Sequence, residues 1–302
     1  MTYEEILKDL VDKDERFMIL TAENRAAIRN LPDKIGDRFI DTGITEQTMV
    51  GVAAGLALRG RIPVAHALAS FLTMRAFEFI RTDVGIGNLP VKLVGGFSGF
   101  LSEANGPTHQ AIEDVSIMRG IPNVNVFCPA DEEDMLIGLR KVMESPEPFY
   151  IRYNNIKPVY KHSEKFEIGK AEVVSEGKDV TIIVYGVLFG QAVEAKEILE
   201  KKGLSVGLIN LRTVKPADEE AILNAAVNSK LLVTLEDHFI TGGLYSITAE
   251  LFLRNKIICD VLPIALKDSW FKPALLQDVL EYEGYTGKKI AEWISNYKEI
   301  FN

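Results

Sequence analysis

Cysteine is almost absent from this 302-residue chain, which has only Cys128 and Cys259. The two lie far apart without the C-x-x-C spacing of redox or zinc sites, and each borders an apolar run. We therefore expect two buried thiols in a reducing compartment. No run of about 18 apolar residues is present, which argues against a membrane-spanning helix. Basic residues are outnumbered by acidic ones, 34 to 43, and the net charge of −9 argues against a nucleic-acid-binding surface.

The first residues, MTYEEILKDLVDKDER, are charged and acidic. That composition is unlike a secretory signal or an arginine-rich transit peptide, so we expect a cytoplasmic protein. Internal repeats and low-complexity tracts are also absent from the sequence. What is present is a long chain with 47% hydrophobic side chains, enough for a large core and for two domains.

Apolar runs typical of strands alternate with helical patterns along most of the chain, which predicts mainly parallel sheets covered by helices on both faces. The pattern lapses in YNNIKPVYKHSEKFE, which is polar and lacks apolar periodicity. We therefore expect two tandem doubly wound α/β domains, residues 1–155 and 168–302, joined by a linker at 156–167. The expected strands are residues 17–20, 39–40, 62–65, 91–94, 124–127, 149–152, 180–185, 206–209, 231–235 and 257–262, and the expected helices include residues 3–11, 45–57, 70–82 and 131–144.

Residues 41–57, DTGITEQTMVGVAAGLA, are the most informative stretch. An apolar run ends at Asp41, a glycine turn follows, and a helix rich in small residues begins near Thr45, which is predicted to cap it. One carboxylate, Glu46, then falls in the first turn of the helix. From spacing alone, a solvated acid that complements the helix dipole remains a full alternative to a functional group.

A second informative segment is the long loop GGFSGFLSEANGPTH, which follows a strand predicted to be buried. Ligand crevices in open α/β sheets lie at the carboxyl ends of strands, so this loop is expected at a binding site. His109 and Glu46 would both lie at such ends and could converge, although a lone loop histidine is more often structural. Phe71 and Phe77, by their helical spacing, are typical of core aromatics.

Three of these motifs, taken in order, resemble the C-terminal half of transketolase: GITEQ at 43–47, the helix beginning at Ser70-Phe71, and GPTHQ at 106–110. LEDHFITGG at 235–243 also resembles a segment of that family, so the similarity covers essentially the whole chain. More generally, the chain is similar to the pyrimidine-binding and C-terminal domains of thiamine-diphosphate enzymes. The resemblance implies these two folds, and a transferase that moves a two-carbon ketol unit from a ketose donor to an aldehyde acceptor.

For individual residues the resemblance implies definite roles. Glu46 matches the glutamate that hydrogen-bonds the aminopyrimidine of thiamine diphosphate and thereby promotes deprotonation of the thiazolium carbon. Phe71 matches the aromatic residue that stacks on the pyrimidine, and Leu68 stands where many relatives have a second phenylalanine. His109 matches the histidine that faces the substrate and assists proton transfer.

The family pattern is incomplete in one respect. The chain has no GDG motif with the following asparagine, which in this family holds Mg²⁺ and the diphosphate. The resemblance therefore implies a split enzyme whose N-terminal, diphosphate-binding subunit is a separate chain. We expect that partner to hold Mg²⁺ and the diphosphate, no metal ligands in this chain, and an α2β2-type assembly with the site at the interface.

Several positions that contact substrate depart from the family pattern. Asn105 stands where transketolases usually have an aspartate, and Phe97 where they usually have a phosphate-contacting histidine. A serine that contacts phosphate in relatives would fall near Ala27 of this chain. A dianionic phosphate is held best by several charge-assisted hydrogen bonds. Their loss predicts a sugar that lacks the terminal phosphate or carries another group there.

Other residues remain candidates for substrate contact. Arg152, in YIRYNN, matches a phosphate-binding arginine of the family, and Arg25 is near enough in sequence to replace an early arginine that is missing. His66 stands where relatives usually have serine. The full set of candidate substrate contacts is His66, Asn105, His109, Arg152 and Arg25.

Two other functions remain open from the sequence. The β subunit of a 2-oxoacid dehydrogenase has the same two-domain layout and a similar Glu-Gln helix start, but GPTHQ favours transketolase. A non-catalytic interaction module is the second alternative, and the presence of Glu46, Phe71 and His109 together argues against it. In relatives the C-terminal domain mainly contributes dimer contacts, so His238 and the Gly242-Gly243 turn are expected to be structural.

Overall fold

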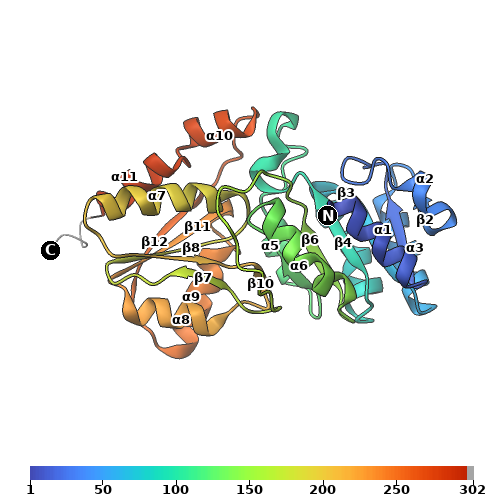
Figure 1. Ribbon diagram of the computed structural model, residues 1–302, viewed down its shortest axis with the longest axis horizontal. Helices are drawn as coiled ribbons and strands as arrows, with labels where there is room; N and C mark the ends of the chain where they lie inside the picture. Colours follow the sequence, from blue (N-terminus) through green and yellow to red (C-terminus); the bar gives the residue numbers. More distant parts are fainter. Residues whose placement is uncertain (298–302) are drawn as a thin grey trace.

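The computed structural model describes residues 1–297, apart from the side chain of Ala104, and contains two β-sheets placed end to end, each with helices on both faces (Figure 1). The last residues of the expected second domain, 298–302, lie outside the described part. The first half contains α1 (Tyr3–Lys13), β1 (Phe17–Thr21), α2 (Pro32–Ile35), β2 (Phe39–Asp41), α3 (Glu46–Leu58), β3 (Ile62–Leu68), α4 (Phe77–Phe79), β4 (Lys92–Gly96), η4 (Gly99–Asn105), α5 (Asp114–Arg119), β5 (Asn125–Phe127), α6 (Glu132–Glu144) and β6 (Phe149–Arg152). The second half contains β7 (Glu172–Ser175), β8 (Val180–Val184), α7 (Phe189–Lys201), β9 (Val206–Asn210), β10 (Thr213–Lys215), α8 (Glu219–Asn228), β11 (Leu231–Phe239), α9 (Leu244–Asn255), β12 (Asp260–Leu266), α10 (Leu276–Glu283) and α11 (Gly287–Ser295).

The first sheet has seven strands in the order β10-β5-β6-β4-β3-β1-β2, and only β10 runs antiparallel to its neighbour. Alternate side chains face opposite layers, as the pleat requires. Phe17 and Ile19 pack against α1 and α6, whereas Met18 and Leu20 belong to the core beneath α3. These fully buried strands explain why the sequence shows continuous apolar runs rather than alternation.

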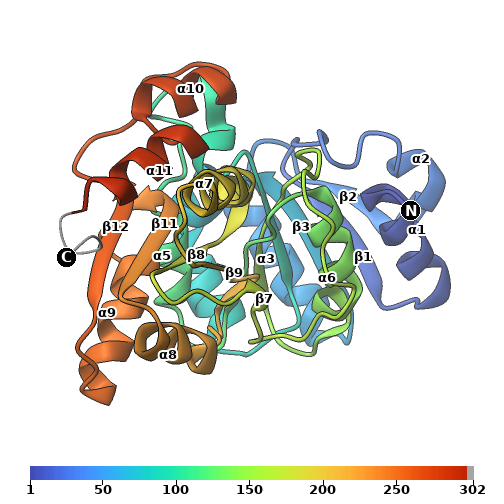
Figure 2. The same ribbon diagram turned by 60° about the vertical axis from the view of Figure 1, so that its left-hand side comes forward.

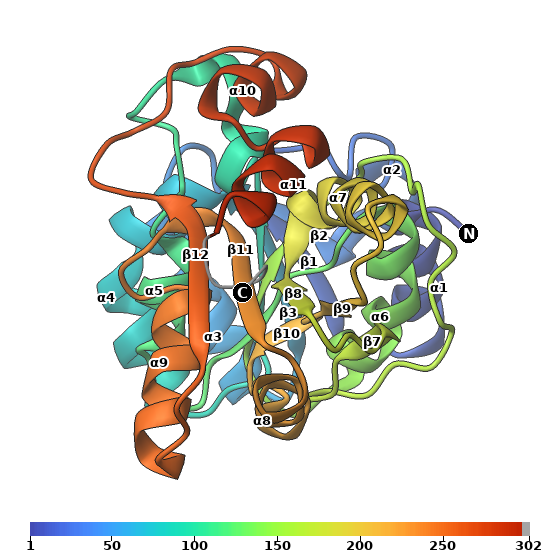
Figure 3. The ribbon, with the colours of Figure 1, turned by 90° about the vertical axis from the view of Figure 1, so that its left-hand side faces the viewer.

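The second sheet has five strands in the order β12-β11-β8-β9-β7, with only β7 antiparallel. One face is covered by α7 and α11 and the other by α8 and α9 (Figure 3). The core under α8 and α9 is continuous with the core under α3 and α5 of the first half. The predicted class, two tandem α/β units with mainly parallel sheets, is confirmed. No helix among residues 1–297 has the length and apolar character needed to cross a membrane.

The two halves are more entwined than the sequence indicates. The short strand β10 comes from beyond the expected linker, yet it pairs with β5 at the edge of the first sheet. A strand from the second half therefore completes the edge of the first sheet, and the boundaries at 155 and 168 stay a prediction. Three residues, Thr-Val-Lys, carry no periodic signal, which is why this strand was not predicted.

Local details also differ from expectation. The expected helix at 70–82 contains π-helical turns at Phe71–Arg75 and Ile80–Gly85, with α4 between them. Thr45 does precede α3, but its hydroxyl donates to the carbonyl of Thr42 and makes no capping bond. Cys128 is buried as expected, whereas the prediction for Cys259 is wrong, because that thiol is only half-buried.

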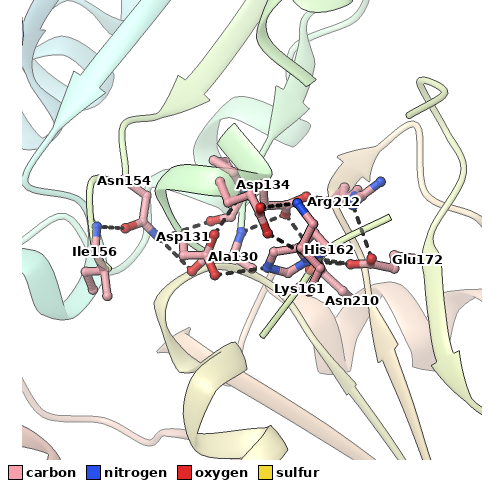
Figure 4. Close-up of polar contacts among 12 residues, drawn as sticks. Ala130, Asp131, Asp134, Asn154, Ile156, Lys161, His162, Glu172, Asn210 and Arg212 are labelled. Atoms are coloured by element: carbon pink, nitrogen blue, oxygen red, sulfur yellow. Dashed lines mark hydrogen bonds and ion pairs between the residues drawn. The ribbon is translucent and has the colours of Figure 1, made fainter. Parts of the chain in front are cut away.

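The segment predicted as the linker contributes to a cluster of buried charged side chains. His162 lies between two carboxylates, with Nε2 at 2.9 Å from Asp131 and Nδ1 at 2.7 Å from Glu172 (Figure 4). Arg212 is 2.6 Å from Asp134 and 3.3 Å from Glu172. Because these residues come from α6, the linker, β7 and the segment after β9, the cluster joins the two halves of the chain.

Three members of this cluster, Asp134, His162 and Glu172, place possible metal-ligand atoms within 4.8 Å of one another. A metal requires a free imidazole nitrogen, however. Both ring nitrogens of His162 are already hydrogen-bonded to carboxylates. Burial alone lowers the pKa of His162, but the hydrogen bonds to Asp131 and Glu172 outweigh it and raise the pKa to about 10. We therefore interpret the group as an imidazolium between carboxylates.

Candidate cofactor and substrate site

Glu46 lies at the first turn of α3, just beyond the carboxyl end of β2. The turn before it requires Gly43, whose φ is +71°, and it is closed by Asp41, which accepts the Gly43 N–H at 2.9 Å. Small residues such as Ala53 and Ala54 let α3 pack closely on the sheet. As a result Glu46 is only 2% exposed, so the alternative of a solvated acid is excluded.

Arg75 connects Glu46 to an aromatic ring. Its Nη1 donates to Glu46 Oε2 at 2.8 Å, and its guanidinium carbon lies 4.1 Å from the centroid of the Phe71 ring. On the other side, the Phe71 ring meets the His109 imidazole edge to face, with centroids 5.0 Å apart. Glu46, Phe71 and His109 therefore form one contiguous group at the carboxyl ends of the strands.

This group suits the aminopyrimidine of thiamine diphosphate. A planar nitrogenous ring with N–H donors needs a carboxylate at its edge and an aromatic face to stack on. The Arg75 guanidinium is planar, carries N–H donors, and makes both of these contacts, with Glu46 and with Phe71. The Arg75 side chain is 40% exposed, so it can leave without disturbing the core. Leu68, half-buried at the end of β3, lies three residues before Phe71.

His109 is carried by a turn that is fixed by backbone bonds. Its N–H donates to the carbonyl of Gly106 at 2.9 Å, and its Nδ1 is 2.9 Å from the hydroxyl of Thr108. Gly106 has a φ of +82°, a conformation that glycine adopts without strain. The imidazole is partly exposed.

A cavity of about 150 Å³ lies at the carboxyl ends of the central strands of the first sheet. Two of its lining residues are in the left-handed region that bulky residues avoid, namely Phe97 at φ +59° and Glu103 at φ +46°. Such strain is held in place by the surrounding structure and is common at binding sites. The lining residues are Asn24, Ala26, Ala27, His66, Val94, Gly96, Phe97, Leu101, Glu103, Tyr153 and Asn155.

The cavity has no cationic side chain in its lining, as far as residues 1–297 define it. Burial lowers the pKa of His66 to about 4, so the imidazole is neutral. Its nitrogens are engaged with the Tyr3 hydroxyl at 2.9 Å and the Leu20 carbonyl at 3.1 Å, so His66 contributes shape and no charge. Glu103 contributes a carboxylate, which disfavours a dianionic ligand.

Two predicted substrate residues lie away from the cavity. Arg152 is buried, with Nη2 at 2.6 Å and Nε at 2.9 Å from Asp114 and Nη1 at 2.7 Å from Asp237. The guanidinium therefore bridges two buried carboxylates inside the protein, and its contact with a substrate stays a prediction. Asn105 is exposed, and its Nδ2 donates to the Ser102 carbonyl at 3.2 Å.

Arg25 is exposed but is also engaged. Its Nε lies 3.1 Å from Asp41 Oδ2, and its guanidinium lies 5.4 Å from the centroid of the Phe39 ring. It is therefore directed toward β2, although Asn24 and Ala26 on either side of it in the chain line the cavity.

Arg75 and Glu103 were not predicted from the sequence. Arg75 follows Phe71 by four residues, a spacing that places two side chains on one face of a helix, so the signal was available. Glu103 carried no such signal, because its direction depends on the strained turn of η4.

The fold and this constellation define a class: two linked α/β units with a buried glutamate at a helix start, as in the pyrimidine-binding half of thiamine-diphosphate enzymes. The family models agree. Residues 1–157 match the transketolase pyrimidine-binding domain, and residues 169–290 match the transketolase C-terminal domain. The chain belongs to the transketolase family, which confirms the resemblance seen in the sequence and implies dependence on thiamine diphosphate.

Individual relatives agree with this assignment. The chain is 36% identical over 295 residues to the 6-deoxy-6-sulfo-D-fructose transketolase subunit SqwH of Clostridium sp. (strain MSTE9), covering 96% of this chain and 91% of that protein. It is 35% identical to a putative transketolase C-terminal section of Methanocaldococcus jannaschii, covering 97% and 93%. A 1-deoxy-D-xylulose-5-phosphate synthase of Dictyoglomus thermophilum is 36% identical, and the chain spans 50% of its length.

Solved structures give the same picture. A split-gene transketolase, described as an inactive β4 tetramer, superimposes with a TM-score of 0.86 at 32% identity, covering 97% of this chain and 95% of the other. Transketolase from Campylobacter jejuni superimposes with a TM-score of 0.74 at 19% identity, covering 97% of this chain and 45% of the other, which shows a shared fold.

Proposed function

We propose that the chain is the C-terminal subunit of a split transketolase that moves a two-carbon ketol unit from a ketose to an aldehyde acceptor. The observation that carries the proposal is the buried Glu46, which Arg75 links to the Phe71 ring, with His109 in contact with the same ring. The bound cofactor supplies the carbanion chemistry. In this chain Glu46 would hydrogen-bond the edge of the pyrimidine ring, and Phe71 and Leu68 would pack against the face of that ring. His109 would transfer protons at the substrate hydroxyls.

The active unit requires a second chain in this proposal. The N-terminal subunit would hold the diphosphate and Mg²⁺, and the two chains would assemble as α2β2. Large apolar side chains that are exposed on α3 and on the neighbouring segment 71–86 support this, because a subunit interface would remove them from water. They include Leu58, 74% exposed, Met74, 38% exposed, and Phe79, 37% exposed.

The substrate in this proposal is a sugar without a terminal phosphate. The cavity that contains Phe97 has a carboxylate, Glu103, and a neutral imidazole, His66, in its lining. A phosphate dianion is best held by charge-assisted hydrogen bonds, and this lining supplies none from Lys or Arg. The relative named as a 6-deoxy-6-sulfo-D-fructose transketolase subunit supports a sugar substrate whose terminal carbon carries a group other than phosphate. The predicted residues His109 and Asn105 are candidates for polar contacts with such a sugar, and the structure adds Asn24, which lines the cavity.

The test is reconstitution with the chain encoded beside this one, provided that it carries a GDG-type diphosphate motif. We expect ketol transfer only when both chains, thiamine diphosphate and Mg²⁺ are present. Glu46→Gln should lower kcat about 100-fold or more, because the lost contact acts directly on the reacting group. The neighbouring Gln47→Glu is a matched control that leaves kcat within about twofold of the original chain.

The donors compared are xylulose 5-phosphate, its unphosphorylated form and a sulfonated ketose. A preference for xylulose 5-phosphate would contradict the proposal that the sugar substrate lacks a terminal phosphate. Full activity of Glu46→Gln, or oxidative decarboxylation of pyruvate with a lipoyl domain, contradicts the proposed reaction.

A further inference from the structure

The loop that carries His109 is packed against the C-terminal half of the chain. The Phe100 ring meets Phe271 and Tyr285 edge to face, with centroid distances of 5.1 and 4.9 Å. Phe100 and Ile112, at the two ends of this loop, belong to the hydrophobic core of the second sheet. Figure 2 shows the η4 turn beside α10, which follows Phe271 in the chain.

The residue after His109 makes the most direct of these attachments. Gln110 is fully buried, and its Nε2 donates to the carbonyl of Phe271 at 2.8 Å. At the other end of the loop, Asp237 accepts the Phe100 N–H at 3.2 Å. The side chains of the loop therefore point into the C-terminal half on both sides of His109.

Backbone bonds extend the attachment past the loop. The Phe239 N–H donates to the Ile112 carbonyl at 3.0 Å. The Ser116 N–H, in α5, donates to His238 Nε2 at 3.2 Å. Burial lowers the pKa of His238 to about 4, so the neutral imidazole accepts this bond, and the expected structural role of His238 stays a prediction.

The first half, by comparison, meets His109 through the Phe71 ring. An edge-to-face ring contact restrains the imidazole but does not fix the backbone that carries it. The contacts that attach this loop at Phe100, Gln110 and Ile112 thus come from residues more than 120 positions further along the chain.

We propose that the C-terminal half positions His109 for ketol transfer, with Gln110 as the positioning residue. This inference rests on the proposed function and assigns the C-terminal half a task beyond contacts between subunits. A displacement of about 1 Å at a reacting group can lower a rate about 100-fold. Loss of the Gln110–Phe271 bond should therefore lower kcat without altering the contacts of Glu46 with the cofactor.

The experiment uses the complex reconstituted with the N-terminal partner and the variant Gln110→Met, which keeps the volume and removes the donor. We expect kcat to fall about 10- to 100-fold, while the Kd of thiamine diphosphate stays within about twofold. In a His109→Ala background the same substitution should change kcat by less than about twofold, because its target is gone. Gln191→Met is the matched control, since Gln191 accepts the Gly287 N–H at 2.9 Å within the C-terminal half.

A second readout does not need activity. Amide hydrogen exchange of residues 99–112 should quicken in Gln110→Met, while exchange of residues 46–58 stays unchanged. If Gln110→Met fails to fold, Phe100→Leu removes the ring contacts at the other end of the loop and takes its place.

Rate losses that multiply in the His109→Ala background overturn the positioning role, and so does a parallel loss of cofactor affinity. If the original complex has no ketol-transfer activity, the proposed function fails by itself. Exchange then decides the inference: unchanged exchange at 99–112 overturns it.

Discussion

Two buried bases are expected to give opposite pH dependences to the stability of this chain between pH 7 and 9. His162 has a pKa raised to about 10, because hydrogen bonds to Asp131 and Glu172 outweigh its burial. Lys92 is fully buried under α6, with its Nζ donating to the Ser145 carbonyl at 2.7 Å. Burial lowers the pKa of Lys92 to about 7, and the nearby Glu147 only partly offsets this.

The two signs follow from proton counting. Between its ordinary pKa of 6.5 and about 10, folded His162 keeps a proton that the unfolded chain has released, so stability falls as pH rises. Between about 7 and 10.5, folded Lys92 has released a proton that the unfolded chain still binds, so stability rises with pH. Each contributes at most about 1.4 kcal/mol per pH unit, and in the original chain the two partly cancel.

Separate substitutions should therefore reveal both slopes. His162→Gln removes the falling contribution, so its unfolding free energy should rise by about 2 kcal/mol relative to the original chain between pH 7 and 9. Lys92→Met removes the rising contribution, and its unfolding free energy should fall relative to the original chain by a similar amount. At pH 7 His162→Gln is also expected to be less stable, because Asp131 and Glu172 lose their cation.

The assay is urea unfolding at pH 7, 8 and 9, followed by circular dichroism, with the m-value checked for constancy. The free-energy differences between each variant and the original chain are compared across pH, so that other titrating groups cancel. Differences that stay constant from pH 7 to 9 for both variants would refute the reasoning. Slopes of the same sign would refute it as well.

Three further substitutions test separate features. Gly99→Ala should cost about 3 kcal/mol or more of unfolding free energy, because a Cβ at φ +56° would lie 1.7 Å from Asp237 Oδ2; an unchanged melting temperature contradicts this. Arg152→Met should cost about 3–5 kcal/mol by leaving Asp114 and Asp237 unpaired, and adding Asp237→Asn should restore part of it in denaturant titrations. Phe97→Gly should raise the unfolding free energy by about 1 kcal/mol, because glycine relieves the strain at φ +59°; a clear loss would mean that the ring contributes more than the strain costs.

The candidate site residues were predicted from short motifs, and the structure shows why short windows of sequence could indicate them. Glu46 follows a strand and a glycine turn, and His109 follows a Gly-Pro turn, so a short window of sequence is enough to indicate each residue. Parallel strands then bring their carboxyl ends to one edge, which is why the two could be expected to converge. The roles of Glu46, Phe71, Leu68 and His109 remain proposals.

Other features depended on contacts between distant segments. The motif around Arg152 indicated a phosphate ligand, but Asp114 and Asp237 surround it in the fold, and Asp237 is 85 residues away. The polar composition of residues 156–167 indicated a linker, but it did not indicate that His162 lies between Asp131, the N-cap of α6, and Glu172 of β7. Local sequence patterns contain no information about such contacts between distant residues.

By itself the sequence determined the class of fold, because apolar periodicity is a property of short windows and directly reflects which face of a strand or helix is buried. It also determined the family, because the spacing within GITEQ and GPTHQ is local. The tertiary structure alone decided which groups are charged, shielded or held in place: the burial of Glu46, the protonation of His162 and the docking of the His109 loop on the C-terminal half. These follow from desolvation and charge pairing, which depend on the segments that the complete fold brings together.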